Sequence, residues 1–344
     1  MPNAPTRRAA LALLAAAALP CGLARAQDEV APATLVGLDA LLDEAASLDA
    51  LETVLVSRRR TVLAERGYGG AAPDRPTNIK SASKTIVSAL VGIAIERGLL
   101  EGVDQPVAPL LRDKLPADPD PRLYRITIGH LLTMRAGLER TSGANYGSWV
   151  ASRDWVRDAL ARPFVDEPGG TMLYSTGSTH LLSAILARES GRSTRALAED
   201  WLGAIDGFRI TGWETSPAGI HLGGNQMAMT PRSLLAFGET YAAGGRAADG
   251  TRVVPESWIA QSWMPRTRSR FTGDGYGYAW FAREIGGRDV RYAWGYGGQM
   301  LYVVPDLDLV VAMTSDETRP SARTGYRDRL HALLGDIVAV VSRE

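Results

Sequence analysis

The sequence predicts a mixed α/β fold of the α+β type, in which helices flank an antiparallel sheet and a mainly helical subdomain is inserted into that sheet. Three observations support this prediction. Strand patterns occur near both ends, at 51–68 and from Tyr276 onward; helical patterns broken by proline or glycine fill 101–245; and a last helical pattern covers 322–341. If both sets of strands share one sheet, the helical region lies between them as an insertion.

Each expected element rests on a local pattern. Apolar spacing at 38–48 predicts a helix, and LETVLVSRRRTVLAERGY at 51–68 predicts two strands around an arginine turn. Four C-terminal strands are predicted by YGYAWFAREI, RDVRYAW, QMLYVVP and LDLVVAMTS, the last two joined by a tight turn at Pro305 and Asp306. We expect a sheet subdomain of about 27–80 and 250–344 and a helical subdomain of about 81–249.

Residues 1–26 have the pattern of a signal peptide. Two arginines precede an apolar run at 9–19, and an Ala-x-Ala-like site at 24–26 places cleavage before Gln27. The alternative, an uncleaved anchor, would need about 20 apolar residues. We therefore expect export to the periplasm or the cell exterior, with a weak match to a twin-arginine route. The single cysteine, Cys21, lies in this segment, so the mature chain has neither a disulfide nor a cysteine nucleophile.

Charge and motif content disfavour several function classes. The 38 basic and 38 acidic residues cancel without long single-sign runs, so neither nucleic acid nor, after signal cleavage, a membrane is an expected partner. The sequence contains no G-x-S-x-G, H-E-x-x-H or G-x-x-x-x-G-K-[ST] motif, and its four histidines are widely spaced. We expect no metal and no cofactor, and a small-molecule substrate; the sequence does not indicate an oligomeric state.

The segment NIKSASKTIVSALVGIAIERGLL, at 78–100, carries an S-x-x-K motif formed by Ser81 and Lys84. Residues three apart on a helix are neighbours, so the Lys84 amine can reach the Ser81 hydroxyl and act as its base. The sequence has only three lysines, and arginine, its usual basic residue, does not release a proton in proteins. The alternative is a helix-capping serine beside a lysine that extends to solvent.

Two further stretches supply groups that a serine nucleophile needs. YSTGSTHLLSAIL begins with Tyr174, and a lysine cation nearby would lower the pKa of this tyrosine and make it a proton shuttle. In WGYGGQMLYVVP, glycines on both sides of Tyr296 permit a close backbone approach, so that a strand N–H can point at a reacting carbonyl. The alternatives are a half-buried ring at a helix start and a simple hairpin entry.

With these motifs, the chain resembles the serine β-lactamase and penicillin-binding protein superfamily. It is most similar to the class C-like branch of esterases, D-aminopeptidases and 6-aminohexanoate-dimer hydrolases. The resemblance extends from about Leu51 to Val341 and includes ITIGHLLTMRAGL, GGNQMAMTPRSLLAFG and VVPESWI, which we interpret as scaffold. His130, in the first of these, is accordingly expected to be structural.

The resemblance implies the roles of individual residues. Ser81 corresponds to the nucleophile, Lys84 to its base, and Tyr174 to the tyrosine of the Y-x-N motif. Tyr296, Gly297 and Gly298 stand at the K-T-G position, where they would bind substrate, and the backbone N–H groups of Ser81 and Gln299 would form the oxyanion hole. The implied reaction is acyl transfer through an acyl-enzyme, with Lys84 or Tyr174 as the formal base.

Two departures from the family motifs bear on the substrate. Thr176 replaces the asparagine of Y-x-N, and Tyr296 replaces the lysine that would meet a substrate carboxylate. Both changes favour an ester or small amide over a β-lactam or D-Ala-D-Ala peptide, although β-lactamase or carboxypeptidase activity remains an alternative. A non-catalytic ligand-binding protein is the alternative from a different class.

Two groups of side chains could shape substrate binding. Tyr146, Trp149 and Trp155 could line an acyl pocket, with core packing as the alternative. Arg266, Arg268 and Arg270 could meet a substrate carboxylate, with a solvated loop as the alternative.

Overall fold

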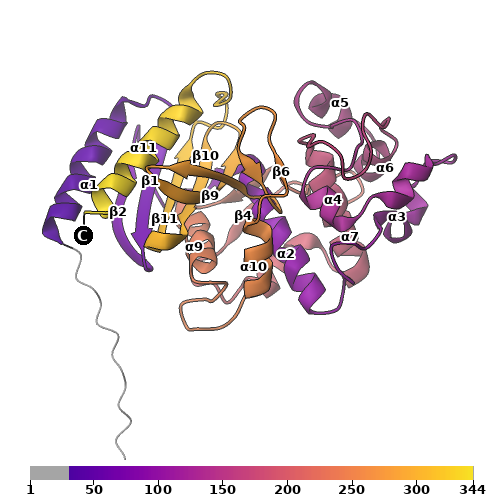
Figure 1. Cartoon of the computed structure of the whole chain (residues 1–344), viewed down its shortest axis with the longest axis horizontal. Helices are drawn as coiled ribbons and strands as arrows, with labels where there is room; N and C mark the ends of the chain where they lie inside the picture. Colours follow the sequence, from indigo (N-terminus) through magenta and orange to yellow (C-terminus); the bar gives the residue numbers. More distant parts are fainter. Residues whose placement is uncertain (1–30, 344) are drawn as a thin grey trace, which may run out of the picture.

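The computed structural model describes residues 31–343. Its centre is an eight-stranded antiparallel sheet with helices on both faces, and helices α3–α7 gather beyond one end of this sheet (Figure 1). The predicted fold class is therefore confirmed. The predicted signal peptide and Cys21 lie outside the described residues. Within 31–343, no helix has the length and apolar character needed to cross a membrane.

The large sheet joins the two ends of the described chain. Its strand order is β2-β1-β11-β10-β9-β8-β7-β6, and β1 pairs with β11, for example Leu55 with Ala312. The strands are β1 (Leu51–Arg58), β2 (Thr61–Gly67), β6 (Thr267–Arg268), β7 (Gly275–Tyr276), β8 (Phe281–Ile285), β9 (Arg288–Gly295), β10 (Gln299–Val304) and β11 (Leu309–Ser315). Short, strongly apolar strands such as β10 and β11 are buried along their whole length, because helices cover both faces.

The two faces of the sheet belong to different cores. Helices α1 (Pro32–Glu44) and α11 (Tyr326–Val341) pack on one face, with Tyr302 of β10. Helices α2 (Lys84–Glu96) and α9 (Pro231–Ala242) pack with the opposite face, where Leu301 of β10 points. This alternation follows from the two-residue period of a strand.

The inserted region contains the remaining helices and a small sheet. Its three strands run in the order β3 (Thr77–Asn78), β5 (Met227–Met229) and β4 (Ile210–Trp213). The helices are α3 (Val107–Leu110), α4 (Ile128–Leu132), α5 (Tyr146–Val150), α6 (Trp155–Leu160), α7 (Thr176–Ser190), α8 (Thr194–Trp201) and α10 (Glu256–Trp263). Single 3₁₀ turns are η1 (Ala45–Ser47), η2 (Lys80–Ser83), η3 (Arg112–Lys114), η4 (Pro121–Arg125), η5 (Gly143–Asn145) and η6 (Pro305–Leu307).

Several predicted boundaries differ from the structure. YGYAWFAREI is not one strand, because the chain turns between β7 and β8, where Ala279 adopts φ +68°. Helix α11 begins four residues later than predicted, after Gly325 at φ +78°. The first helix begins at Pro32, since proline is well suited to the first turn of a helix.

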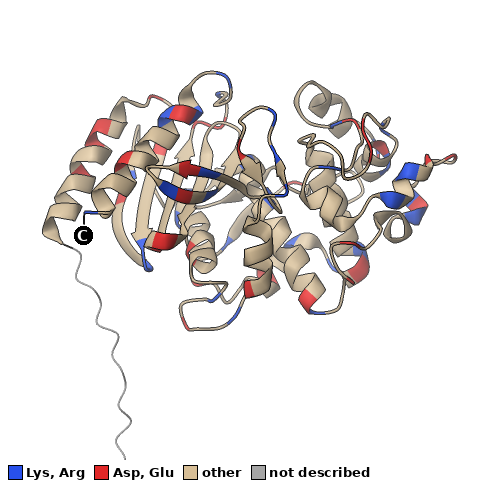
Figure 2. Cartoon of the chain, viewed as in Figure 1, with Lys and Arg blue, Asp and Glu red and all other residues tan. Residues whose placement is uncertain are grey.

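Charged residues are interspersed over both the sheet and the helical parts (Figure 2). Several ion pairs of the described residues join two exposed side chains, such as Arg192 with Asp200 and Arg288 with Asp306. Pairs of this kind contribute little to stability. We therefore attribute the stability of the fold mainly to its buried apolar clusters.

Candidate active site

Ser81 lies in the 3₁₀ turn η2, which leads directly into α2. The preceding residue, Lys80, has φ +50°, and its N–H donates to Asn78 Oδ1 at 2.9 Å. A non-glycine residue in this left-handed region is strained, and such strain is typical of functional turns. The turn places the Ser81 side chain in the wall of a large cleft.

Lys84 is the first residue of α2, and its side chain is only 1% exposed. Its Nζ lies 3.0 Å from Ser81 Oγ, 2.5 Å from the Gly224 carbonyl oxygen and 3.4 Å from Thr176 Oγ1. Burial lowers the pKa of Lys84 to about 7, because desolvation disfavours the ammonium form. Near neutral pH a large fraction of this lysine is therefore an unprotonated amine that can accept the Ser81 proton.

Tyr174 approaches the same two residues from the segment before α7. Lys84 Nζ lies 5.1 Å from the centroid of the Tyr174 ring, which also stacks on Phe281. Burial raises the pKa of Tyr174 to about 12, although a hydrogen bond with Ser81 acts in the opposite direction. The expectation that the lysine lowers this pKa is wrong, because burial dominates. Tyr174 is thus a neutral phenol at pH 7, suited to donating a proton.

Gly224 is a residue of the site that the sequence motifs did not predict. Its carbonyl accepts the shortest hydrogen bond of Lys84, and its φ is +77°. A Cβ at this position would lie 2.3 Å from Lys84 Cγ, so only glycine fits without displacing the lysine. Gly224 belongs to GGNQMAMTPRSLLAFG, and the paired glycines were the available signal.

Thr176 begins α7 and lines the cleft beside Lys84. Its backbone N–H donates to Ser142 Oγ at 2.8 Å, and the two hydroxyl oxygens are 3.0 Å apart. Ser142, which no sequence motif indicated, therefore fixes the start of α7. Together the two hydroxyls form a polar edge next to the lysine.

The end of β9 packs directly against the Ser81 turn. A Cβ on Gly295 would lie 2.3 Å from the Ile79 carbonyl oxygen, so the absence of a side chain permits this approach. Tyr296 is 51% exposed and lines the cleft. Gln299 begins β10, and its buried side-chain amide is fixed by donating to the Ser315 carbonyl at 2.5 Å.

Gly297 and Gly298 are not among the residues that line the cleft, and their predicted role in substrate binding stays a prediction. Both have positive φ, +88° and +107°, and turn the chain behind Tyr296. A Cβ on Gly297 would lie 2.7 Å from the Asp316 carbonyl, and one on Gly298 would lie 2.9 Å from the Tyr326 ring. These glycines shape the turn before Gln299.

The cleft has a volume of about 1030 Å³ and a mixed lining. Its aromatic residues are Tyr146, Tyr174, Phe271, Phe281, Trp294 and Tyr296, and its charged residues are Lys80, Arg140, Glu317, Arg323, Arg327 and Asp328. Lys80 Nζ lies 3.2 Å from Glu317 Oε2, so the cation next to Ser81 is paired. The space accommodates an organic substrate with both apolar and polar parts.

Of the proposed acyl-pocket residues, only Tyr146 reaches the cleft, where its hydroxyl accepts from Asn225 Nδ2 at 2.8 Å. Trp149 and Trp155 are buried together with Leu222, so the core-packing alternative holds for both. Their indole N–H groups are satisfied by backbone carbonyls, at 2.9 and 3.0 Å. The tryptophans thus support the site from behind rather than contacting substrate.

The three predicted loop arginines do not line the cleft. Arg266 stacks over Tyr278, Arg268 donates to the Gly273 carbonyl and Arg270 donates to Thr171. Their loop reaches the cleft through Ser269 and Phe271 instead. Each guanidinium therefore has a structural contact.

His130 forms a capping box at the start of α4. Its backbone N–H donates to Thr127 Oγ1 at 3.2 Å, and its Nδ1 accepts from the Thr127 N–H at 3.3 Å. Burial lowers its pKa. These contacts confirm the structural interpretation of His130.

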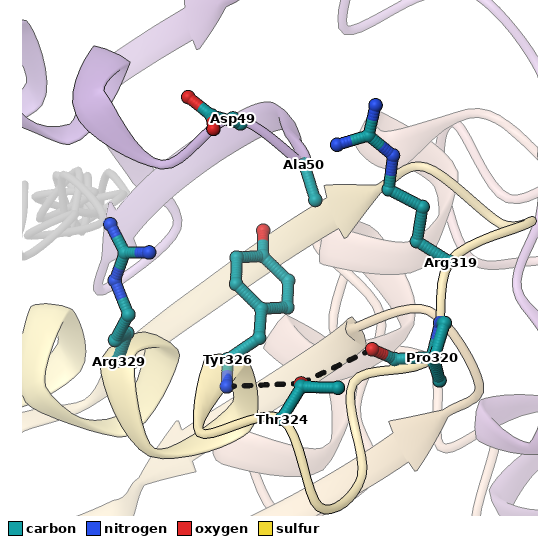
Figure 3. A pocket seen from close by; sticks show the side chains of 7 residues that line it. All are labelled: Asp49, Ala50, Arg319, Pro320, Thr324, Tyr326 and Arg329. Atoms are coloured by element: carbon teal, nitrogen blue, oxygen red, sulfur yellow. Dashed lines mark hydrogen bonds between the residues drawn. The ribbon is translucent and has the colours of Figure 1, made fainter.

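A second hollow of about 310 Å³ lies at the start of α11 (Figure 3). Arg319 and Arg329 flank it, and the Tyr326 ring stands between them. The Tyr326 hydroxyl lies 2.9 Å from Ser315 Oγ, which donates to the Gly298 carbonyl at 3.3 Å. Through these bonds α11 supports the turn before Gln299.

Within 31–343, no group of three or more histidine, cysteine, aspartate or glutamate side chains is arranged to hold a metal ion. What the cleft does bring together is a hydroxyl, a buried amine of lowered pKa and a neutral phenol. These are the groups that nucleophilic acyl transfer requires.

Comparison with known proteins gives consistent matches. The family described as Beta-lactamase matches residues 46–336. A 6-aminohexanoate-dimer hydrolase of Paenarthrobacter ureafaciens is 26% identical over 358 residues, covering 94% of this chain and 88% of that protein. Two solved structures resemble the fold. EstCE1, a hydrolase with promiscuous acyltransferase activity, has a TM-score of 0.71 and 18% identity, with 88% of this chain and 98% of that chain covered. A class C β-lactamase from Rhodobacter sphaeroides has a TM-score of 0.66 and 17% identity, with 90% of this chain and 100% of that chain covered.

Proposed function

Because this chain belongs to the β-lactamase family and is a serine hydrolase, we propose that it cleaves an ester or a small amide through an acyl-enzyme on Ser81. One observation carries the proposal. The Lys84 amine, buried and with its pKa lowered to about 7, lies 3.0 Å from the Ser81 hydroxyl. A lysine in this state is a base at neutral pH, which a solvent-exposed lysine is not.

In the first step, Lys84 takes the proton of the Ser81 hydroxyl while Oγ bonds to the substrate carbonyl carbon. The carbonyl oxygen becomes an oxyanion, which the backbone N–H groups of Ser81 and Gln299 stabilise. Each donor contributes on the order of 3 kcal/mol to lowering the barrier. The bond to the leaving group then breaks, and Tyr174 donates its phenolic proton to that group and recovers one from Lys84.

In the second step, water attacks the acyl carbon and releases the acid. Tyr174 and Lys84 pass the water proton back to Ser81 Oγ as the acyl bond breaks. We assign Lys84 as the base and Tyr174 as the acid, since the pKa of the lysine is lowered to about 7 and that of the tyrosine is raised to about 12. These opposite shifts support a division of the two roles.

The polar groups around Ser81 favour an ester or small amide over a β-lactam. Thr176 and Ser142 offer short hydroxyls in place of an asparagine amide, and Tyr296 offers a phenol in place of a lysine cation. The neighbouring Lys80 is neutralised by Glu317. The relative named as a 6-aminohexanoate-dimer hydrolase makes a small amide a candidate substrate beside an ester.

The proposal is tested by intact-mass labelling of the protein with a fluorophosphonate. We expect one adduct per chain, which is lost in Ser81→Ala. Ser88→Ala is the matched control, because this serine lies in α2, which directly follows the Ser81 turn, and its hydroxyl donates to the Tyr278 carbonyl. A screen of p-nitrophenyl esters, short amides and nitrocefin then identifies the substrate class.

An unlabelled wild-type protein would refute the serine hydrolase mechanism and favour a ligand-binding role. Rapid nitrocefin turnover, with no turnover of esters, would favour the β-lactamase alternative.

We also propose export directed by residues 1–26. N-terminal sequencing of the protein from the periplasm or medium should begin at Gln27. A different first residue, or a protein found only in the cytoplasm, would contradict this proposal.

A further inference from the structure

His180 is a buried, titratable residue that the proposed reaction does not use. It lies in α7 and is fully buried between Trp149 and Trp155, whose rings stand edge-on to the imidazole at centroid distances of 5.6 and 5.5 Å. Two bulky indoles around one imidazole fix the position of this ring. The histidine is thus a rigid part of the wall behind the cleft.

The imidazole makes a specific bond to the turn that contacts the catalytic lysine. His180 Nδ1 accepts from the Gly223 N–H at 3.3 Å. We assign Nδ1 as the acceptor from this contact, which puts the proton of the neutral ring on Nε2, a buried atom with no hydrogen-bond partner among the described residues. Burial lowers the pKa of His180 to about 4, against the opposing influences of the His221 backbone carbonyl and the Asp154 carboxylate. The ring is therefore a permanent acceptor at neutral pH.

Gly223 is also held close to α7 by its lack of a side chain. A Cβ at this position would lie 2.2 Å from the Thr179 carbonyl oxygen. The next residue, Gly224, presents its carbonyl to Lys84 Nζ at 2.5 Å. The bond from Gly223 to His180 therefore anchors the chain one residue before the acceptor of the lysine.

We propose that His180 is a positioning residue, which holds the Gly223–Gly224 turn so that the Gly224 carbonyl meets Lys84 and sets its proton affinity. This inference rests on the proposed function, in which Lys84 is the base. A carbonyl acceptor stabilises the ammonium form more than the amine. Loosening the turn therefore lowers the pKa of Lys84 further and displaces its amine from Ser81.

Few charged groups lie near the His180 ring and the Gly223–Gly224 turn. Asp154, at the start of α6, acts on His180 and is itself paired with Lys114 at 2.8 Å. Trp149 of α5, Trp155 of α6, the Gly223 N–H and the His221 carbonyl also contact or act on the ring, and none of them carries a charge. Desolvation is the cause of the shifted pKa of Lys84. Because hydrogen bonds of Gly223 and Gly224 link His180 to Lys84, we expect the turn to transmit a change at His180 to the titration of Lys84.

Two substitutions separate the acceptor from the ring. His180→Phe keeps an aromatic ring between the tryptophans but removes the acceptor. His180→Asn removes the ring but keeps an acceptor oxygen at the place of Nδ1. The matched control is His331→Phe, which alters another buried histidine, bonded to the Tyr302 hydroxyl on the opposite face of the sheet.

The readout is NMR of protein labelled with ¹³Cε-lysine, which requires no turnover. The sequence contains only three lysines, so Lys80→Arg and Lys114→Arg leave the Lys84 signal identified by elimination. We expect the Lys84 midpoint to fall by about one unit in His180→Phe, since one hydrogen bond to a charged group is weakened. It should keep its wild-type value in His180→Asn and in His331→Phe.

A folded His180→Phe with an unchanged Lys84 midpoint would overturn the proposal, and so would an equal shift in His180→Asn. The imidazole of the wild-type protein provides a test that depends on no variant. Its ¹⁵N shifts should report protonated Nε2 and bare Nδ1, and the opposite tautomer would also overturn the proposal. Fluorophosphonate labelling tests the nucleophile separately, so failure of the proposed function is distinguishable from failure of the positioning role.

Discussion

Replacing Gly224 by alanine should disable the site while leaving the fold intact. The new Cβ would lie 2.3 Å from Lys84 Cγ and 3.1 Å from its Nζ. Ordinary carbon contacts begin near about 3.5 Å, so the lysine must retreat by roughly an ångström. A misplacement of this size costs about 10²-fold in rate. We therefore expect kcat and the rate of fluorophosphonate labelling to fall at least about 100-fold.

The backbone of Gly224 contributes a separate cost, which a control can isolate. Its φ of +77° costs about 1–2 kcal/mol for any residue with a Cβ. Gly219 has nearly the same angle, +76°, but a Cβ there would meet no atom within 4 Å. Gly219→Ala should thus lose a similar stability from strain, and it should keep its activity.

Labelling kinetics and thermal unfolding of the two variants separate the crowding of Lys84 from the backbone strain at position 224. Crowding of Lys84 adds about 1–3 kcal/mol of destabilisation in Gly224→Ala alone. If Gly224→Ala folds and is labelled at the wild-type rate, the lysine does not need its observed position. The assignment of Lys84 as the base would then be refuted.

Three further outcomes follow from the ionisation of the site. Since the pKa of Lys84 is lowered to about 7, the acylation rate should rise about tenfold per pH unit below that value and level off above it, as stopped-flow assays of ester turnover would report. Tyr174→Phe should lower kcat by about 10²–10⁴ with little change in KM, because the ring stays in place while its proton donation and its hydrogen bond with Ser81 are lost. Lys84→Met should raise the free energy of unfolding at pH 6 by up to roughly 5 kcal/mol, since a lysine whose folded pKa lies below its unfolded pKa opposes folding at low pH. Denaturant unfolding should show this gain shrinking as pH rises from 7 towards 10.

The sequence predicts the fold class because strands and helices leave short-range patterns in the chain. Apolar runs at β10 and β11 and the S-x-x-K spacing at Ser81 each follow from strand or helix geometry. The misplaced boundaries occur where single residues decide them. Ala279 turns the chain between β7 and β8 in a left-handed conformation, which is uncommon for alanine and could not be predicted from the sequence.

The features that the sequence missed depend on contacts between distant residues. Gly224 lies 140 positions from Lys84, and Ser142 lies 34 positions from Thr176. The two tryptophans of the proposed acyl pocket have suitable chemistry, but their orientation depends on Leu222 and on α7. Composition identifies an aromatic cluster without indicating which face it presents to a substrate.

The raised pKa of Tyr174 explains how the site divides its proton transfers between two residues. Proximity to a lysine cation would lower the pKa of the tyrosine, yet the burial that surrounds both groups acts more strongly. Burial disfavours every charged form, so it lowers the pKa of the lysine to about 7 and raises that of the tyrosine to about 12. One low-dielectric environment therefore yields a neutral amine and a neutral phenol next to the same hydroxyl. The assignment of base and acid follows from the depth of the site, which no local sequence pattern encodes.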